Sequence, residues 1–259
     1  MSFPLSRHAA LAAPPQTWQA SFPLNPPTTT AAGQSLLNQV ISRVLPLPLF
    51  LVAMLFIPAR TLHFWQGWAF VGCYCAATLV FVAYFHYRDQ QLLARRMLRV
   101  EKVGQQKIVL LLLKLNFTLV LVLCGFDHRF GWTTHWLAPV PPWLTLLALA
   151  LIVGCQILFL WVMDTNRYAA SIIQIEPGQT IADSGPYRQV RHPMYAVGIV
   201  QSFLTPLALG SFIVWPLFAL VIPILVWRLL NEETILRHDL PGYSAYCERT
   251  RYRLVPHVW

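Results

Sequence analysis

Charged side chains are scarce in this chain. Asp, Glu, Lys and Arg make up 11% of its 259 residues, whereas hydrophobic residues make up 56%. Soluble domains carry about 25% charged residues, so this composition excludes an ordinary soluble domain and is typical of a protein that crosses a membrane several times. We therefore expect an all-α fold, a polytopic membrane helix bundle of about five to six transmembrane helices.

Several sequence motifs that are typical of metal-binding proteins and soluble enzymes are also missing. The five cysteines form no Cys-x-x-Cys pair and no Cys/His ligand spacing, so we expect reduced packing residues and no metal site. The absence of a Gly-rich dinucleotide fingerprint argues against a soluble Rossmann methyltransferase or dehydrogenase. Residues 1–39 are rich in Pro, Thr, Ala and Gln and contain no apolar run of signal-peptide length, which favours a flexible tail.

Long apolar runs predict four membrane-spanning helices between residues 40 and 163, at 40–59, 65–84, 108–126 and 143–163. The loop at 88–107 is basic, and its apolar residues have nearly helical spacing, which predicts an amphipathic segment on the membrane surface. Its basic residues are either a lipid-headgroup patch or a topology signal. Residues 164–259 then form a C-terminal core of connecting segment, helical hairpin and tail.

The hairpin is predicted from a single apolar run of 35 residues, 196–230. Two full crossings need about 40 residues and a turn, and the run is interrupted by Pro206, Gly210, Pro216 and Pro223. We therefore expect two short or kinked helices that turn near residues 209–211, followed by a polar, aromatic tail that covers the site.

The distribution of Lys and Arg predicts the orientation. Basic residues gather in 88–107, in 167–191 and in 237–253, whereas the two opposite loops keep only Arg60 and Arg129. We expect a multi-pass integral membrane protein with both termini cytoplasmic, in the plasma or inner membrane if the chain is bacterial.

Two ionisable clusters bracket the hairpin. Residues 185–195 carry two arginines and a histidine in the sequence GPYRQVRHPMY, and residues 228–233 end in Glu232-Glu233. Ionisable groups beside lipid are costly and mark a functional site by default. We therefore assign the chemistry of the chain to these two clusters.

The spacing inside the clusters suggests two poles. Pro193 suits the first turn of a helix, so His192 and unpaired amides at that helix start would favour an anion. Arg228 lies four residues before Glu232 and shares a helix face with it, and Glu232 offers a carboxylate. A zwitterionic ligand would suit such a site. The simpler alternatives are an interfacial His192 and an ordinary surface pair between Arg228 and Glu232.

The combination of Arg-His-Pro-x-Tyr with a later Glu-Glu pair resembles the isoprenylcysteine carboxyl methyltransferase and phospholipid methyltransferase family of integral membrane enzymes. The resemblance covers residues 164–259 and implies that S-adenosyl-L-methionine lies between the connecting segment and the C-terminal tail. It also implies an acceptor-facing role for Arg228. The cofactor-binding residues carried over by motif are Gln174, Tyr187, His192, Pro193, Tyr195, Glu232 and Glu233.

The resemblance implies a lipophilic or small acceptor in or beside the lipid bilayer. The family acts on prenylated cysteine carboxylates, phosphatidylethanolamine amines and small thiols, and these three classes stay open. We expect no nucleic-acid partner. An NADPH-dependent membrane reductase of the sterol or steroid type is the alternative enzyme, since such enzymes carry a similar Arg-His-x-x-Tyr block. Their block continues with an acidic residue after the glycine, whereas Ile199 follows Gly198 here. A non-catalytic membrane scaffold is the third possibility.

Overall fold

The computed structural model describes residues 38, 40–42, 44–96, 104–168 and 178–259. The chain divides into two compact units, Met1–Asn38 and Gln39–Trp259, and the fold described here is that of the second. Of the predicted tail, residues 1–39, all but Asn38 lie outside the described residues.

The second unit is built from helices, and its described residues contain no strand. Five helical stretches are long and apolar enough to cross a membrane: Val40–Ala59, Trp65–Arg88, Gly104–Phe130, Pro142–Thr165 and Trp215–Asp239. The chain is therefore a polytopic helical membrane bundle, and the predicted fold class is confirmed. The second, third and fourth spans are longer than predicted, because each helix continues past the end of its apolar run.

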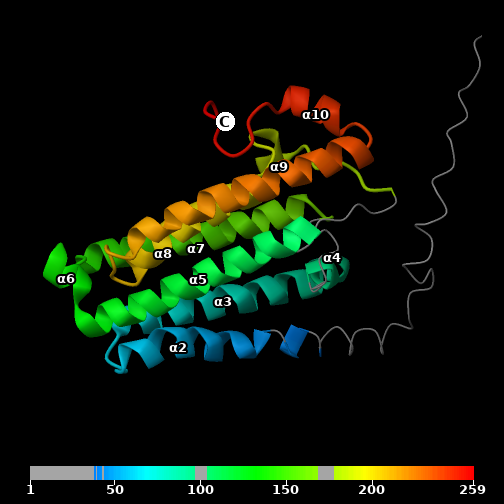
Figure 1. Ribbon diagram of the computed structural model, residues 1–259. Helices are drawn as coiled ribbons and strands as arrows, with labels where there is room; N and C mark the ends of the chain where they lie inside the picture. The colour runs from blue at the N-terminus through cyan, green and yellow to red at the C-terminus, as the bar shows by residue number, and fades with distance from the viewer. Residues whose placement is uncertain (1–37, 39, 43, 97–103, 169–177) are drawn as a thin grey trace, which may run out of the picture. The chain divides into compact units, whose positions relative to one another are not determined.

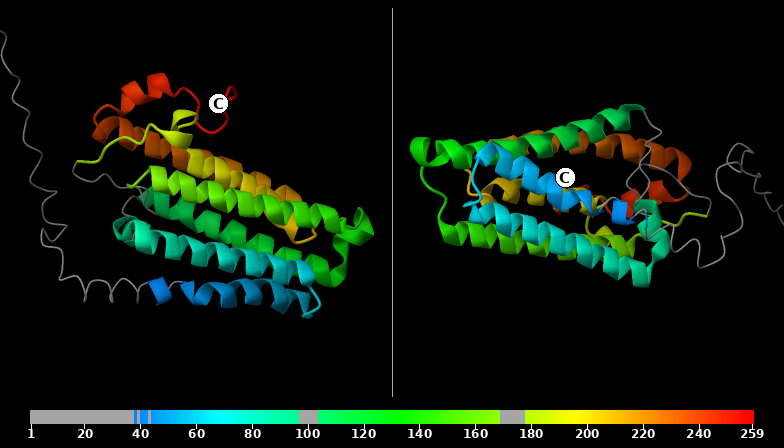
Figure 2. Two further views of the ribbon diagram at one scale, coloured as in Figure 1. Left: turned by 180° about the vertical axis from the view of Figure 1, so that it is seen from behind. Right: turned by 90° about the horizontal axis from the view of Figure 1, so that it is seen from below.

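The spans pack pairwise along their length (Figure 1 and Figure 2). Helix α2 (Pro46–Ala59) lies against α3 (Trp65–Arg88) and α5 (Gly104–Phe130), while α7 (Pro142–Thr165) lies against α3 and α8 (Pro193–Ala208). Helix α9 (Val221–Asp239) packs on α5. Proline occupies the first turn of α2, α7 and α8, where its missing N–H costs no helical hydrogen bond.

The C-terminal hairpin turns near residues 209–211, as predicted from its prolines and glycine. Helix α8 ends at Ala208, and Gly210 has a φ of 76°, a conformation that glycine adopts without strain. The 3-10 helix η3 (Trp215–Leu220) then leads into α9. The backbone N–H groups of Phe212 and Ile213 donate to the hydroxyl of Thr133 in the short helix α6 (Trp132–Trp136). The hairpin tip therefore reaches the end of α5 that lies far from the α9 C-terminus.

The first part of the predicted amphipathic segment is helix α4 (Gln90–Arg96). Its residues Leu92 and Leu93 are buried within the protein, so the apolar side of this helix packs on the bundle itself. Residues 97–103, which complete the predicted segment, lie outside the described residues.

Candidate functional site

A cavity with a volume of about 100 Å³ lies where five segments meet. Its walls come from the connecting segment, the 3-10 helix η2 (Gly185–Arg188), the start of α8, the end of α9 and the helix α10 (Tyr243–Arg249). Figure 1 shows α10 and the C-terminal stretch beside the last turns of α9. The volume of the cavity is smaller than the roughly 300–1,000 Å³ of typical ligand pockets.

The structure brings most of the predicted site residues to this cavity. Those on its wall are Tyr187, His192, Tyr195, Arg228 and Glu232. Pro193 and Glu233 stand beside wall residues in the chain but are not on the described wall. Gln174 lies outside the described residues, so its role stays a prediction. Sequence reasoning missed Asn166 and Thr180, which also line the cavity and carry no motif of their own.

A hydrogen-bonded chain links the two ends of the hairpin at the cavity wall. The hydroxyl of Tyr195 donates to Glu232 Oε2 at 2.5 Å and accepts from Arg228 Nε at 3.0 Å. Arg228 also donates from Nη1 to Gln106 Oε1 at 3.1 Å. Arg228 and Glu232 were predicted to be neighbours on one helix face, and the Tyr195 hydroxyl lies between them. Gln106 was not among the site residues predicted from the sequence.

The second glutamate of the pair has a different environment. Glu233 is 3% exposed, and its carboxylate contacts Arg191 Nε at 2.7 Å, Arg253 Nε at 3.2 Å and His192 Nε2 at 3.3 Å. A buried carboxylate requires such compensation, because removal of its hydration is costly. Glu233 thus joins the start of α8, the end of α9 and the C-terminal tail. The assigned cofactor contact of Glu233 stays a prediction.

The backbone amides of the two residues that precede α8 donate to the C-terminal tail, and the unpaired amides expected at the start of α8 itself stay a prediction. The N–H of Arg191 donates to Tyr252 O and that of His192 donates to Arg253 O, both at 2.9 Å. The side chain of Arg191 also donates to the carbonyls of Thr250 and Arg251 at 3.0 Å. The C-terminal tail supplies these acceptors. The sequence around His192 contains no pattern that predicts where this tail lies.

Tyrosines form much of the remaining wall. The hydroxyl of Tyr187 accepts from Asn166 Nδ2 at 3.2 Å, and burial raises the pKa of Tyr187 to about 12, so this phenol is neutral at physiological pH. Tyr246 donates to the carbonyl of Tyr187 at 2.7 Å. The hydroxyl of Tyr243 is buried on the wall without a hydrogen-bond partner. Buried polar groups normally have partners, so this hydroxyl is a candidate contact for a bound molecule.

The fold and the cavity define a class: a polytopic membrane protein with a polar and aromatic cavity at one end of its helices. Within the described part of the chain, no group of three or more His, Cys, Asp or Glu side chains could hold a metal ion.

Residues 146–238 match the family described as the isoprenylcysteine carboxyl methyltransferase (ICMT) family, so this part of the chain is similar to members of that family of methyltransferases. The match includes α8 and α9 with the residues of the cavity that they carry, and it does not favour the reductase alternative. It stops before α10 and the C-terminal tail.

A curated relative has no assigned activity. The protein described as "Uncharacterized protein YpbQ" of Bacillus subtilis (strain 168) is 32% identical over 85 residues. These residues are 32% of this chain and 51% of the relative, so the match spans about half of that protein's length.

Proposed function

We propose that this protein is an integral membrane methyltransferase that uses S-adenosyl-L-methionine and methylates a lipophilic or membrane-associated acceptor. The observation that carries the proposal is the convergence of Tyr195, Arg228 and Glu232 on one cavity. These residues belong to the two halves of the family motif, and a full hairpin separates the halves in the sequence.

The residues present fit the chemical groups of the cofactor. Glu232 provides a carboxylate for an ammonium group, and charge-assisted hydrogen bonds of this type are strong. The unpartnered hydroxyl of Tyr243 and the nearby Tyr187 offer polar contacts on an aromatic wall, which suits a heterocyclic base. His192 lines the same cavity. When bound, S-adenosyl-L-methionine supplies an electrophilic methyl group on a sulfonium.

The chain's own contribution is to hold the acceptor and to exclude water. Arg228 is 5% exposed and is held from two sides by Tyr195 and Gln106, so its guanidinium is oriented before any ligand arrives. A carboxylate or thiolate acceptor needs no further base. A protonated amine would need a proton acceptor, and the raised pKa of Tyr187 makes this hydroxyl a poor source of a phenolate.

Ligand binding to the purified protein tests the proposal. S-adenosylhomocysteine, the product form of the cofactor, should raise the melting temperature in detergent, whereas NADPH should not. The opposite result would assign the cavity to the reductase class, and no shift with either ligand would favour a non-catalytic scaffold. Membranes incubated with methyl-labelled cofactor should then incorporate the label into a lipid, a protein ester or a volatile product, which identifies the acceptor class.

A further inference from the structure

The cavity is smaller than the cofactor proposed for it. Its volume is about 100 Å³, whereas pockets for small organic ligands occupy roughly 300–1,000 Å³. A molecule of the size of S-adenosyl-L-methionine therefore enters only if one wall of the cavity moves outward. The wall that moves most easily is the one whose contacts with the rest of the protein are weakest.

Four of the five wall segments are held by buried contacts. The residues just before α8 meet α9 at the buried carboxylate of Glu233, which lies 2.7 Å from Arg191 Nε and 3.3 Å from His192 Nε2. Helix α10 is joined to η2 by the buried hydroxyl of Tyr246, which donates to the carbonyl of Tyr187 at 2.7 Å. Separation of these segments would leave buried polar groups without partners, which is costly.

The fifth segment, residues 179–184, is held by weaker contacts. Its first four residues, 179–182, line the cavity, and Ile181 packs against the apolar cluster at α10. Its polar connection to α10 is an ion pair from Arg249 Nη2 to Asp183 Oδ2 at 3.4 Å, and these two side chains are 67% and 50% exposed. Exposed ion pairs contribute little to stability, so this wall is the easiest one to displace.

Two glycines with positive φ bound this segment. The φ angle is 75° at Gly178 and 53° at Gly185, a backbone region that glycine enters without strain. Segments that open and close turn about a few residues at their ends. Residues 179–184 can therefore swing outward while the buried residues Pro186 and Tyr187 of η2 stay in place.

We propose that residues 179–184 are a lid that opens to admit S-adenosyl-L-methionine and closes over it, and that the ion pair between Asp183 and Arg249 is the latch of this lid. This inference rests on the proposed function. The closed lid excludes water from the cavity, as the proposed chemistry needs. Neither latch residue is on the described cavity wall, so the latch acts on the motion of the lid and not on the bound molecule.

A latch of this kind has a kinetic signature. It stabilises the closed lid with and without a ligand, so its loss speeds both association and dissociation. The dissociation constant, which is the ratio of the two rate constants, then stays nearly the same. A residue that contacts the ligand would change the dissociation constant instead, and an ion pair that only stabilises the fold would change neither rate.

Stopped-flow binding of S-adenosylhomocysteine to the purified protein tests the lid. Asp183→Asn and Arg249→Gln should each raise both rate constants about two- to fivefold, with less than a twofold change in the dissociation constant. The double variant with Asp183→Arg and Arg249→Asp restores an ion pair of reversed polarity and should return both rates toward those of wild type. High salt should speed both steps more in wild type than in Asp183→Asn, because salt screens an exposed ion pair.

The ion pair between Arg88 and Asp164 provides a matched control. Its distance is also 3.4 Å, and it joins the end of α3 to the end of α7 without involving residues 179–184. Asp164→Asn should therefore leave both rate constants unchanged.

Three results would overturn the lid: unchanged rates in Asp183→Asn and Arg249→Gln, faster dissociation without faster association, or equal acceleration in Asp164→Asn. Each of them leaves the proposed function intact, because wild type still binds S-adenosylhomocysteine. Failure of wild type to bind S-adenosylhomocysteine refutes the proposed function itself, and with it the cofactor assigned to the lid.

Discussion

The two adjacent glutamates show how strongly one position along a helix changes a residue's role. Successive residues on an α-helix point about 100° apart, so Glu232 reaches the cavity while Glu233 lies among Arg191, His192 and Arg253. The sequence motif presents both as one pair. The packing of the tail against α8 distinguishes a carboxylate that lines the cavity from one that joins three segments.

The roles of Glu232 and Arg228 can be separated by substitution. Glu232→Gln keeps the shape but removes the charge, so it should raise the dissociation constant of the cofactor roughly ten- to a hundredfold, as expected for a lost contact of about 1.5–3 kcal/mol. Arg228→Gln should leave cofactor affinity nearly unchanged and lower turnover. Calorimetric titration with S-adenosylhomocysteine and a turnover assay measure the two effects. Equal loss of cofactor binding in both variants would mean that the residues only support each other.

Glu233→Gln is the control for that experiment. Its carboxylate is buried among Arg191, His192 and Arg253, and removal of one partner from a buried ionic cluster costs about 3–5 kcal/mol. The variant should therefore melt at a clearly lower temperature in detergent, whereas Glu232→Gln should not. A Glu233→Gln protein of normal stability would show that the cluster contributes little to the fold.

At the level of helices, the contact between α2 and α5 depends on one glycine. A Cβ atom at Gly125 would lie 2.4 Å from the backbone oxygen of Leu55, whereas a Cβ at Gly154 in α7 would have no neighbour within 4 Å. Gly125→Ala should destabilise the protein by about 1–3 kcal/mol, because the two backbones must move apart. Gly154→Ala should be neutral or stabilising by up to about 1 kcal/mol. Thermal unfolding in detergent compares the two, and equal melting temperatures would contradict the close contact.

The sequence predicts the helices better than the contacts between them. The apolar runs indicate the spans, and the run 196–230 with its prolines and Gly210 indicates a hairpin with the observed turn. Local patterns are sufficient for these features, because hydropathy and backbone restrictions act over a few residues. The bond from Gln106 to Arg228 joins positions 122 residues apart, and no spacing rule connects them. The same holds for the tail carbonyls that accept from Arg191 and His192.

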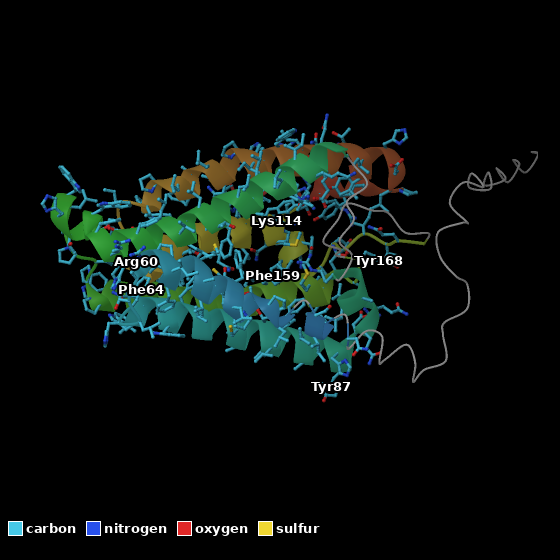
Figure 3. All side chains as sticks on the ribbon, turned by 60° about the horizontal axis from the view of Figure 1, so that its bottom comes forward. Arg60, Phe64, Tyr87, Lys114, Phe159 and Tyr168 are labelled. Carbon is cyan, nitrogen blue, oxygen red and sulfur yellow. The ribbon has the colours of Figure 1, made fainter. Side chains whose placement is uncertain are left out.

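At the scale of the whole bundle, the two ends of the helices differ in chemistry. Figure 3 places Arg60 and Phe64 near one end and Tyr87 and Tyr168 near the other. Tyr168 lines the cavity, and the hairpin tip contacts α6 at the opposite end. The described residues of the predicted basic stretches therefore lie at the end that carries the cavity, and the positive-inside rule predicts that this end is cytoplasmic. S-adenosyl-L-methionine is made in the cytoplasm, so this orientation also places the proposed site where its cofactor is available.

Cysteine labelling tests this orientation. Single cysteines at Gln91 in α4 and Arg251 in the tail should react with a membrane-impermeant maleimide only after the cytoplasmic face is opened, whereas a cysteine at His135 in α6 should react from outside in intact cells. All three positions are exposed. Four of the native cysteines lie within spans and Cys247 is buried, so the unsubstituted protein should label weakly. Labelling of Gln91→Cys and Arg251→Cys from opposite sides would contradict the crossing number, because the α8–α9 hairpin would then fail to return the chain to its starting side. Labelling of both from outside would instead invert the whole bundle and place the cavity away from the cytoplasmic pool of cofactor.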